Sequence, residues 1–453
     1  MSTPLTSKRD SFGSKIGVIA AVSGSAIGLG NIWRFPYVTG ENGGGAFLLV
    51  YLSFILLIGI PVMLSEFVIG RRSQRNTVGA FKKLAPRTPW HIVGFLGIIA
   101  SFVILAFYTT VSGWTLEYLF ISIKNGFSGK SEADLVTQFN TFTSSGLRPV
   151  LWQLLFMFFT AFIVFKGIKN GIEKYTKILM PILLLIIIAL CIRSVTLPDA
   201  GKGLTFLFRP DFSKITGKVL LEALGQAFFS LSIGMGTLIT YSSYINKKEN
   251  LSTAAISISL ADTLIAVLAG VAIFPAVFAF GISPNEGPSL VFITLPLIFD
   301  QMIGGYFFSL IFFILLSIAA LTSTISILEV AVAYLSEELH ISRKKATIAA
   351  SLAISVFGIG STMSLGSWNW LSINGLSLFD CFDKLSANIL LPLGGLLIVI
   401  FVGWFLGKDQ VFDEISNGGK LKARLRWVYL FIIKFIAPIA IALVFLNSIG
   451  LFL

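Results

Sequence analysis

The sequence predicts an all-α protein that crosses a membrane many times. Of its 453 residues, 55% are hydrophobic and 12% are charged, whereas charged residues make up about a quarter of an ordinary soluble domain. Apolar segments of about 20 residues or more, the length with which a helix crosses a bilayer, recur along the chain. Two of these segments are interrupted by Ser and Gly near their middle. Together these observations predict a polytopic helical bundle with two broken helices.

We predict about eleven transmembrane helices. They lie near residues 15–38, 45–70, 90–123, 150–166, 174–194, 217–245, 252–280, 304–337, 345–362, 378–406 and 425–451. The third and the eighth are long enough to tilt strongly or to protrude from the bilayer.

The distribution of Lys and Arg orients these helices. With the N-terminus inside, the inner loops carry 23 of these residues and the outer loops carry nine. Because Lys and Arg accumulate in cytoplasmic loops, we expect the N-terminus in the cytoplasm and, with an odd number of spans, the C-terminus outside. The first span has no small-residue cleavage site, so we expect no cleavable signal peptide.

Two outer loops are too long for tight turns. Residues 124–149 are polar and are expected to form a loop, whereas residues 281–303 combine three prolines with apolar residues. The second composition favours a re-entrant or capping element over an ordinary surface loop.

Several classes of function are disfavoured by composition. Cys191 and Cys381 are far apart and have no partner His, so they form no metal or redox motif. With two His in the chain, His-based catalysis is not expected. The net charge of +12 comes from loop residues that set topology, so it does not indicate nucleic-acid binding. We therefore expect no enzyme activity, no organic cofactor and no nucleic-acid partner. The lipid bilayer is an expected partner, and the sequence specifies no oligomeric state.

The first interruption lies in residues 20–37, which read AAVSGSAIGLGNIWRFPY. In hydrocarbon every peptide N–H and C=O needs a partner, so a broken helix is tolerated only where protein or a hydrated cavity covers it. A break at membrane depth therefore indicates a site. The alternative for one Gly/Ser patch is close packing between helices.

The second interruption lies in residues 225–237, which read GQAFFSLSIGMGT. It comes five spans after the first, so the two broken helices cross the membrane in opposite directions. Paired broken helices in two inverted halves are typical of a transporter site at the interface of the repeats. We predict one transmembrane domain over residues 1–453, with repeats at 15–194 and 217–406 and an additional helix at 425–451.

The residues near the breaks suit small ions and a zwitterion. Free carbonyls and hydroxyls suit a hard cation such as sodium, and helix N-termini suit a carboxylate. Residues 322–324 (TST) add hydroxyls to an apolar helix, although such hydroxyls often bond the carbonyl four residues earlier. Ionisable residues within spans are candidates for function, and here they are Glu66, Asp262, Arg34 and Asp383. For Arg34 and Asp383 the alternative is interfacial snorkelling.

The residues at and after the two breaks resemble the signature of a known family. Residues 28–37 (GLGNIWRFPY), followed by residues 41–47 (ENGGGAF), resemble the signature of the neurotransmitter:sodium symporters, and residues 225–232 (GQAFFSLS) are similarly specific. The resemblance extends over essentially the whole chain. It implies a LeuT-like fold, in which helices 1 and 6 of a five-plus-five inverted repeat are broken. Eleven spans look like a bacterial member, located in the plasma membrane.

The resemblance implies sodium-coupled import of neutral hydrophobic or aromatic L-amino acids by alternating access. The implied substrate-binding residues are Ala26, Leu29, Gly30, Ile104, Tyr108, Phe229, Ser232, Met235, Ser326 and Ile327. The first of two implied sodium sites comprises Ala26, Asn31, Ser230 and Asp262. The second comprises Gly24, Ile27, Ala319, Thr322 and Ser323.

Gates are implied in the same way. The outer gate would pair Arg34 with Asp383 and Tyr108 with Phe229. The inner gate would pair Arg9 with Glu337, supported by Phe12, Ser243 and Tyr244. Gly171 and Pro181 match a Gly-x9-Pro pattern that would let the fifth helix unwind at its cytoplasmic end.

Three positions depart from the family pattern. Phe12 stands where Trp is frequent, and Met235 replaces an aromatic residue, which favours tolerance of bulky side chains because Met is flexible. Asp262 can supply the negative charge that chloride provides in animal members, so we expect chloride-independent transport. Whether Asp262 binds sodium directly or only replaces chloride is open from the sequence.

Other functions fit less well. A proton-coupled transporter, with Asp262 or Glu66 as the carrier, is the nearest alternative, but Thr322 and Ser323 cannot titrate. A channel would need a polar stripe or a charged ring along several helices, whereas the polar groups here cluster at one depth.

Overall fold

The computed structural model describes residues 11–284, 290–373, 375–422 and 424–448, and it confirms the all-α membrane class. Within these ranges, nine helices are long and apolar enough to cross a membrane, and a bent pair supplies a tenth span. These ten spans, and the interrupted pair α11 and α12 that is not among the ten, consist in chain order of the following elements: α1 (Lys15–Ala26), η1 (Gly30–Arg34) and α2 (Phe35–Glu41); α3 (Gly45–Phe54), η2 (Ile55–Gly59) and α4 (Ile60–Ser73); α6 (His91–Ile123); α8 (Leu147–Phe165); η3 (Ile168–Glu173) and α9 (Lys174–Val195); α11 (Gly217–Ser230) and α12 (Thr237–Ser242); α13 (Leu251–Ala279); α15 (Gly305–Glu337); α16 (Arg343–Met363); α17 (Leu378–Lys384), η6 (Leu385–Leu390), α18 (Leu391–Ile400) and η7 (Phe401–Leu406); and α20 (Arg426–Phe431), η8 (Ile432–Ile436) and α21 (Ala437–Ser448).

Both expected breaks are present. α1 and the helix that follows it, Gly30–Glu41, are bent by 49° relative to each other. α11 and α12 are separated by residues 231–236, and with 14 and six residues neither half can cross a bilayer alone. The mid-span Ser and Gly therefore predicted both interruptions correctly.

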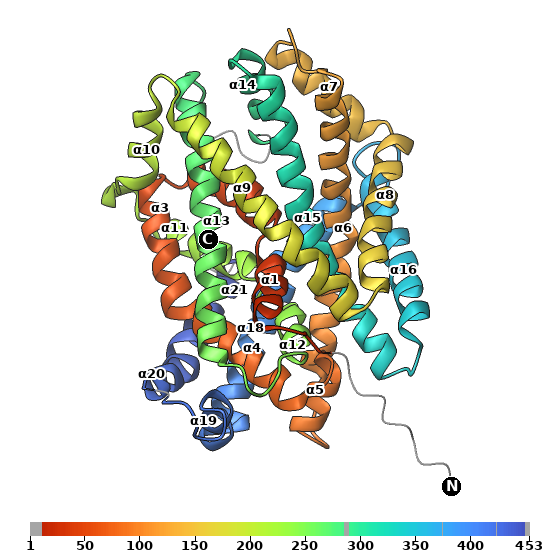
Figure 1. Cartoon of the computed structure of the whole chain (residues 1–453), viewed down its shortest axis with the longest axis vertical. Coiled ribbons are helices and arrows are strands. Elements are labelled where there is room, and N and C mark those ends of the chain that lie inside the picture. Colours follow the sequence, from red (N-terminus) through yellow and green to blue (C-terminus); the bar gives the residue numbers. More distant parts are fainter. Residues whose placement is uncertain (1–10, 285–289, 374, 423, 449–453) are drawn as a thin grey trace.

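Short helices cap the two ends of the bundle. They are α5 (Thr77–Leu84), α7 (Glu132–Ser144), α10 (Ala200–Phe208), α14 (Thr294–Gln301) and α19 (Lys408–Ile415), with the 3-10 turn η4 (Phe212–Lys214) and the hairpin β1 (Ser372–Ile373) and β2 (Leu376–Ser377). Figure 1 shows α5 and α19 at one end and α7, α10 and α14 at the other. This agrees with the alternating direction of the spans.

The expectation of a loop at residues 124–149 is wrong, because α7 lies within it. Ser131 caps this helix: its hydroxyl accepts from the Asp134 amide, and the Asp134 carboxylate accepts from the Ser131 amide. The hydrogen bonds from Ser131 also hold the pKa of Asp134 below its ordinary value. A capping box of this kind begins a helix even in a polar sequence.

The capping element expected at residues 281–303 is supported where the structure describes it, since residues 285–289 lie outside the described ranges. Phe292 is buried, and its ring contacts those of Trp114, Tyr118 and Phe139. α14 follows and packs against α15. The segment therefore covers the ends of the long helices.

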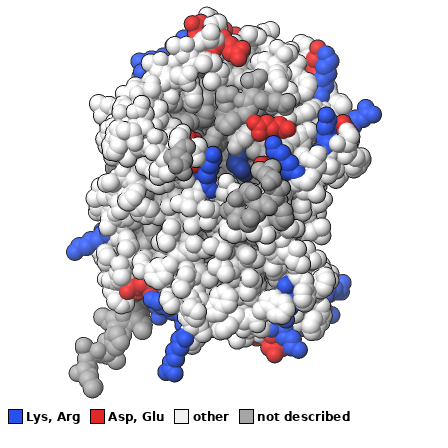
Figure 2. All heavy atoms as spheres, turned by 180° about the vertical axis from the view of Figure 1, so that it is seen from behind, with Lys and Arg blue, Asp and Glu red and all other residues white. Residues whose placement is uncertain are grey.

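Two long helices form the centre of the bundle. α6 and α15, with 33 residues each, pack along one another. α6 also contacts α8 and α16, and α15 contacts α1, α8 and α9. Figure 2 shows charged side chains over the upper half and at the lower end of the molecule, with a largely uncharged band between them. This band is the surface expected to face lipid.

Candidate transport site

The first break brings backbone groups of α1 next to α6 and α15. A Cβ added at Gly28 would lie 2.2 Å from the Ser323 hydroxyl and 2.9 Å from the Tyr108 hydroxyl, so a larger residue there would have to displace both groups. The Gly28 amide instead donates to the Asn31 side chain at 3.1 Å. The sequence of small residues thus lets the open backbone approach two other helices.

The second break uses left-handed backbone at Ser232, Gly234 and Gly236, with φ values of 56°, 85° and 78°. The Ser232 hydroxyl donates to the Ser25 carbonyl at 3.1 Å, which joins the two breaks. The Gly234 amide donates at 2.8 Å to Glu66, a buried carboxylate of α4. Glu66 therefore stabilises the unwound backbone, a role that its position in a span alone could not reveal.

A cavity of about 20 Å³ lies between the two breaks, α6 and α15. Its lining consists of Ser25, Ala26, Gly28, Gly30, Tyr108, Phe229, Ser232, Met235, Ser323 and Ile327. Seven of the ten predicted substrate residues are in this lining. The other three, Leu29, Ile104 and Ser326, are buried but do not line the cavity.

Leu29 and Ser326 contact the lining through hydrogen bonds. The Leu29 amide donates to the Tyr108 hydroxyl at 3.0 Å. The Ser25 hydroxyl donates to that of Ser326 at 2.9 Å. An amide and a phenol hydroxyl that meet at a helix break form a suitable pair for a carboxylate.

Three of the four residues of the first predicted sodium site, Asn31, Ser230 and Asp262, lie together, whereas the fourth, Ala26, lines the cavity. The Asn31 side-chain amide donates to the Asp262 carboxylate at 2.8 Å and to the Ser230 hydroxyl at 3.1 Å. The Ser230 hydroxyl donates to the other Asp262 oxygen at 2.8 Å, and Tyr51 donates to Ser230 at 3.3 Å. These groups are fully buried, and their oxygens form the hard donor set that suits sodium.

The residues of the second predicted sodium site also lie together. The Thr322 hydroxyl is 3.0 Å from the Ala319 carbonyl and 3.3 Å from the Ile27 carbonyl. The Ser323 hydroxyl is 3.4 Å from the Ser25 carbonyl. A Cβ added at Gly24 would lie 3.4 Å from Thr322. This second group of neutral oxygens therefore spans α1 and α15.

The predicted outer gate adjoins the cavity through Phe229. Arg34 donates to Gln226 at 2.6 Å, and its guanidinium lies 4.8 Å from the centre of the Phe229 ring. Asp383 interacts with Arg34 through its charge. Gln226 in turn donates to the Gly30 carbonyl at 2.9 Å. Gln226 is an addition to the predicted gate, because its partners lie on another broken helix and no local pattern in the sequence indicates them.

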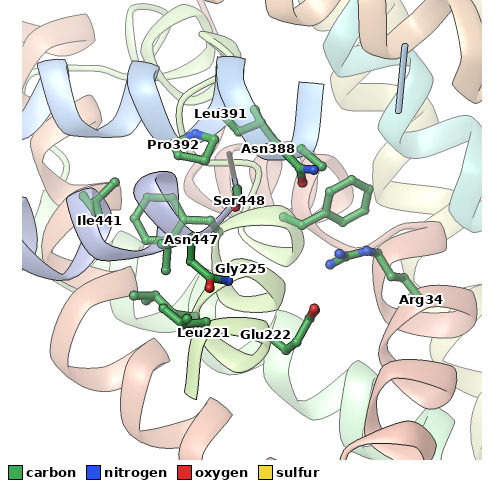
Figure 3. Close-up of a pocket in the computed structure, with 15 residues that line it drawn as sticks. Arg34, Leu221, Glu222, Gly225, Asn388, Leu391, Pro392, Ile441, Asn447 and Ser448 are labelled. Atoms are coloured by element: carbon green, nitrogen blue, oxygen red, sulfur yellow. The ribbon is translucent and has the colours of Figure 1, made fainter. Parts of the chain in front are cut away.

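A further cavity of about 80 Å³ opens beside this gate. Figure 3 shows Arg34 at one edge of it and Ile441 of α21 at the opposite edge. Glu222, Asn388 and Asn447 also line it. Phe229 lines both cavities, so the larger cavity lies next to the candidate site.

The predicted inner gate is described only in part, because Arg9 lies outside the described residues. Glu337 accepts from the backbone and side-chain amides of Asn76, at 2.8 Å and 3.1 Å. Tyr244 donates to Glu329 at 2.8 Å, and the Phe12 ring contacts that of Tyr244. The predicted residues therefore contact several helices at this end of the bundle.

The structure adds Glu329 and Arg343 to this end. Arg343 donates to both oxygens of the buried Glu329 carboxylate, at 2.9 Å and 2.5 Å. Neither residue was predicted, because an acid within α15 and a base at the start of α16 have no recognisable spacing in the sequence.

Gly171 lies in η3, which continues directly into α9, and Pro181 lies inside α9. A Cβ at Gly171 would lie 2.1 Å from the Ile163 carbonyl. Two residues further, the Glu173 carboxylate accepts from the Gly13 amide at 2.6 Å and the Ser14 hydroxyl at 3.0 Å. Glu173, which was not among the predicted residues, thus connects the start of the fifth span to the start of α1.

These features define a class of protein. A helical membrane protein in which two oppositely directed broken helices enclose a small cavity and two oxygen-rich groups at mid-span is a secondary transporter. The particular family follows from comparison with known proteins. The chain belongs to the sodium:neurotransmitter symporter family, whose sequence model matches residues 9–137 and 135–452.

The relatives agree with this assignment. An uncharacterised sodium-dependent transporter of Bacillus subtilis, YhdH, is 41% identical over 97% of each chain. An uncharacterised sodium-dependent transporter of Haemophilus influenzae is also 41% identical, over 97% of this chain and 98% of its own. The crystal structure of MhsT in complex with L-phenylalanine matches with a TM-score of 0.90 and 48% identity, over 97% of this chain and all of MhsT. The protein is thus a sodium-dependent symporter with a LeuT-like fold, and it is not an enzyme.

Proposed function

We propose that this symporter imports neutral hydrophobic or aromatic L-amino acids, coupled to sodium at two sites and independent of chloride, by alternating access. The observation that carries the proposal is the cavity between the breaks. Its lining combines polar groups that suit an amino acid's carboxylate and ammonium with the apolar side chains of Phe229, Met235 and Ile327. The L-phenylalanine bound to the related MhsT supports this class of substrate.

Each end of the substrate has suitable partners. The Leu29 and Gly30 amides suit a carboxylate because they lie at the N-terminal end of the second half of span one, where the Tyr108 hydroxyl of α6 meets the Leu29 amide. Carbonyls around Ala26, Phe229 and Ser232 suit an ammonium group. Met235 adapts to side chains of different shape because it is unbranched and flexible. Opening of this cavity toward one side must precede binding, since about 20 Å³ holds roughly one water molecule.

Coupling follows from shared residues. The substrate carboxylate would lie next to Asn31 and Ala26, so it would complete the first sodium site directly. The second site holds α1 against α15 through Ile27 and Thr322. Sodium there would stabilise the closed inner half of α1, and its release would follow loosening of the fifth span near Gly171. Each ion thereby shifts the equilibrium between the outward-facing and the inward-facing state, because it binds one of them more tightly than the other.

The Asp262 carboxylate supports chloride independence. It accepts from Asn31 and Ser230 within a buried cluster that includes Tyr51. A fixed negative charge here stabilises a neighbouring sodium ion, as a bound chloride would. In this proposal Asp262 acts beside the sodium or as its ligand.

Uptake by reconstituted protein tests the proposal. Proteoliposomes are given labelled L-phenylalanine, L-leucine or glycine under a sodium gradient, a proton gradient or neither, with chloride or gluconate as the anion. We expect uptake of phenylalanine and leucine only with the sodium gradient, and equally with both anions. Uptake driven by protons alone would refute sodium coupling and favour Asp262 or Glu66 as a proton carrier.

We also propose a location in the bacterial plasma membrane with the N-terminus in the cytoplasm and the C-terminus outside. The excess of Lys and Arg on one side supports this orientation. Labelling of single cysteines placed at Lys83 and at Glu132 with an impermeant reagent tests it. In intact cells Glu132→Cys should react and Lys83→Cys should not; the reverse result would invert the orientation.

A further inference from the structure

α8 supplies no candidate ligand, yet it makes buried polar contacts with α6 and α15, two of the helices that carry candidate ligands. Gln153 contacts α6 beside Tyr108, and Thr160 contacts α15 beside Thr322 and Ser323. Gln153 and Thr160 are seven residues apart, so they lie on one face of the helix about two turns, or ~10.5 Å, from each other. Both are buried. With this spacing, Gln153 lies next to the part of α6 that bears Tyr108, and Thr160 lies next to the part of α15 that bears Thr322 and Ser323.

Gln153 forms the centre of a network between α6, α8 and α16. Its side-chain nitrogen donates to Thr109 at 3.3 Å, and its oxygen accepts from Thr362 at 2.7 Å. The hydroxyls of Thr362 and Thr110 are 2.8 Å apart. Thr109 also donates to the Ala106 carbonyl at 3.1 Å. Thr109 and Thr110 directly follow Tyr108 on α6, so the network holds the part of the helix that bears the tyrosine.

The helices around Gln153 are packed so closely that they have little freedom to slide past one another. A Cβ added at Gly113 of α6 would lie 2.7 Å from the Gln153 backbone nitrogen. One added at Gly358 of α16 would lie 2.1 Å from the Gln153 side-chain nitrogen. Sliding α6 by one residue would shift its groups by about 1.5 Å and rotate them by about 100°. Such a shift would leave buried hydroxyls and an amide unpaired, which is costly.

Thr160 makes the corresponding contact with α15. Its hydroxyl is 2.8 Å from that of Thr324, and both are fully buried. Thr324 directly follows Ser323 and donates to the Leu321 carbonyl at 3.0 Å. The contact therefore fixes the segment of α15 that carries the oxygens of the second candidate sodium site.

We propose that Gln153 and Thr160 are positioning residues: α8 sets the register of α6 for the amino-acid carboxylate through Gln153, and the register of α15 for the second sodium through Thr160. This inference rests on the proposed function of the site. It assigns separate effects to two residues that touch neither ligand.

Substitutions that keep side-chain volume test the two effects. In proteoliposomes with labelled L-phenylalanine, Gln153→Leu should raise the KM for phenylalanine about tenfold, equivalent to ~1.4 kcal/mol, with the maximal rate and the sodium half-saturation changed less than about twofold. Thr160→Val should instead raise the sodium half-saturation about tenfold and leave the KM at saturating sodium nearly unchanged. Thr362→Val, which removes the Gln153 and Thr110 contacts together, substitutes for Gln153→Leu if that variant does not fold.

Ser122→Ala is the matched control. Ser122 and Ser309 join the same two helices, α6 and α15, by a buried hydroxyl contact of 2.9 Å, but near their outer ends. This variant should lower thermal stability without changing either transport constant. The proposal is overturned if folded Gln153→Leu or Thr362→Val keeps the wild-type KM, if Thr160→Val keeps the wild-type sodium dependence, or if Ser122→Ala changes the constants equally.

Failure of the proposed function is recognised separately, because wild-type protein would then show no sodium-driven uptake of phenylalanine. In that case the rise in melting temperature caused by sodium alone, relative to choline, still tests the role of Thr160. Thr160→Val should reduce this rise and Ser122→Ala should not. An unchanged rise in Thr160→Val would overturn the proposal.

Discussion

Gly28 is the residue at which the first broken helix approaches its neighbours most closely. Its missing side chain leaves space for the Ser323 and Tyr108 hydroxyls, which a Cβ would approach to 2.2 Å and 2.9 Å. If the Ser323 hydroxyl rotated away, its own Cβ would still lie 3.2 Å from the added carbon, and the Tyr108 hydroxyl could move only by weakening its hydrogen bond from the Leu29 amide. The sequence predicted a break here, but it did not show which of the small residues was indispensable.

Gly28→Ala is therefore expected to reduce sodium-driven uptake at least about tenfold, because overpacking at such a position costs ~1–3 kcal/mol. Gly225→Ala is the matched control, since a Cβ there meets nothing within 4 Å. Alanine within helix α11 should keep uptake and raise the melting temperature slightly. Uptake by Gly28→Ala close to that of Gly225→Ala would contradict the assigned contact.

Asp262 gives a second prediction for a single residue. In Asp262→Asn the buried negative charge next to Asn31 and Ser230 is lost while the side-chain volume is kept. Sodium binding should weaken, and uptake in chloride-free medium should fall about tenfold or more because the buried cation loses a neighbouring charge. Chloride should restore part of this loss. Asp134→Asn, which changes an exposed acid of α7, serves as the control. Equal uptake by Asp262→Asn with and without chloride would argue against charge replacement.

The short helices outside the membrane spans were harder to predict than the spans themselves. The long apolar runs and their interruptions correctly indicated the spans and both breaks, because hydrocarbon imposes length and backbone pairing on them. α7 was mistaken for a loop, since its polar sequence shows no apolar run and is ordered by its capping box. Glu173 and Gln153 were missed for another reason: their partners lie on other elements, so no local pattern marks them.

Glu173 leads to a prediction about the inner half of α1. Its carboxylate holds the Gly13 amide and the Ser14 hydroxyl, and it pairs with Lys177 at 2.5 Å. Glu173→Gln keeps the shape but loses the charge, which weakens charge-assisted hydrogen bonds roughly twofold. The start of α1 should then separate more often from the fifth span, and the inward-open population should grow.

Cysteine accessibility measures this shift. Ala21→Cys, buried in α1, is combined with replacement of Cys191 and Cys381 by serine and labelled from the cytoplasmic side. Glu173→Gln should speed labelling several-fold, because a shift of about 1 kcal/mol toward the inward-open state raises the population of that state several-fold. Lys177→Gln, which keeps the contacts of Glu173 with Gly13 and Ser14, should change it less. Slower or unchanged labelling in Glu173→Gln would show that this contact does not hold the inner half closed.

At the scale of the whole molecule, transport requires the two sodium sites and the substrate site to act on one conformational equilibrium. Coupling between ligands is reciprocal: if sodium raises the affinity for the amino acid by a given factor, the amino acid raises the affinity for sodium by the same factor. The geometry indicates different partners for the two sites. Asn31 and Ser230 lie beside the expected carboxylate, whereas Thr322 and Ser323 connect α15 to α1.

The double variant Thr322→Val with Ser323→Ala separates these roles. It removes both hydroxyls of the second site and keeps the first site, so sodium-driven uptake should be lost. Binding of L-phenylalanine should still depend on sodium through Asn31, Ser230 and Asp262. Ligand binding raises stability by RT ln(1 + [L]/Kd), about 2.7 kcal/mol at one hundred times Kd, so the melting temperature reports it. Phenylalanine should therefore stabilise this variant in sodium and have no effect in choline. Stabilisation in both salts, or normal uptake, would contradict this division of roles. The first site would then not couple sodium to the substrate, or the second would not be needed for the conformational change.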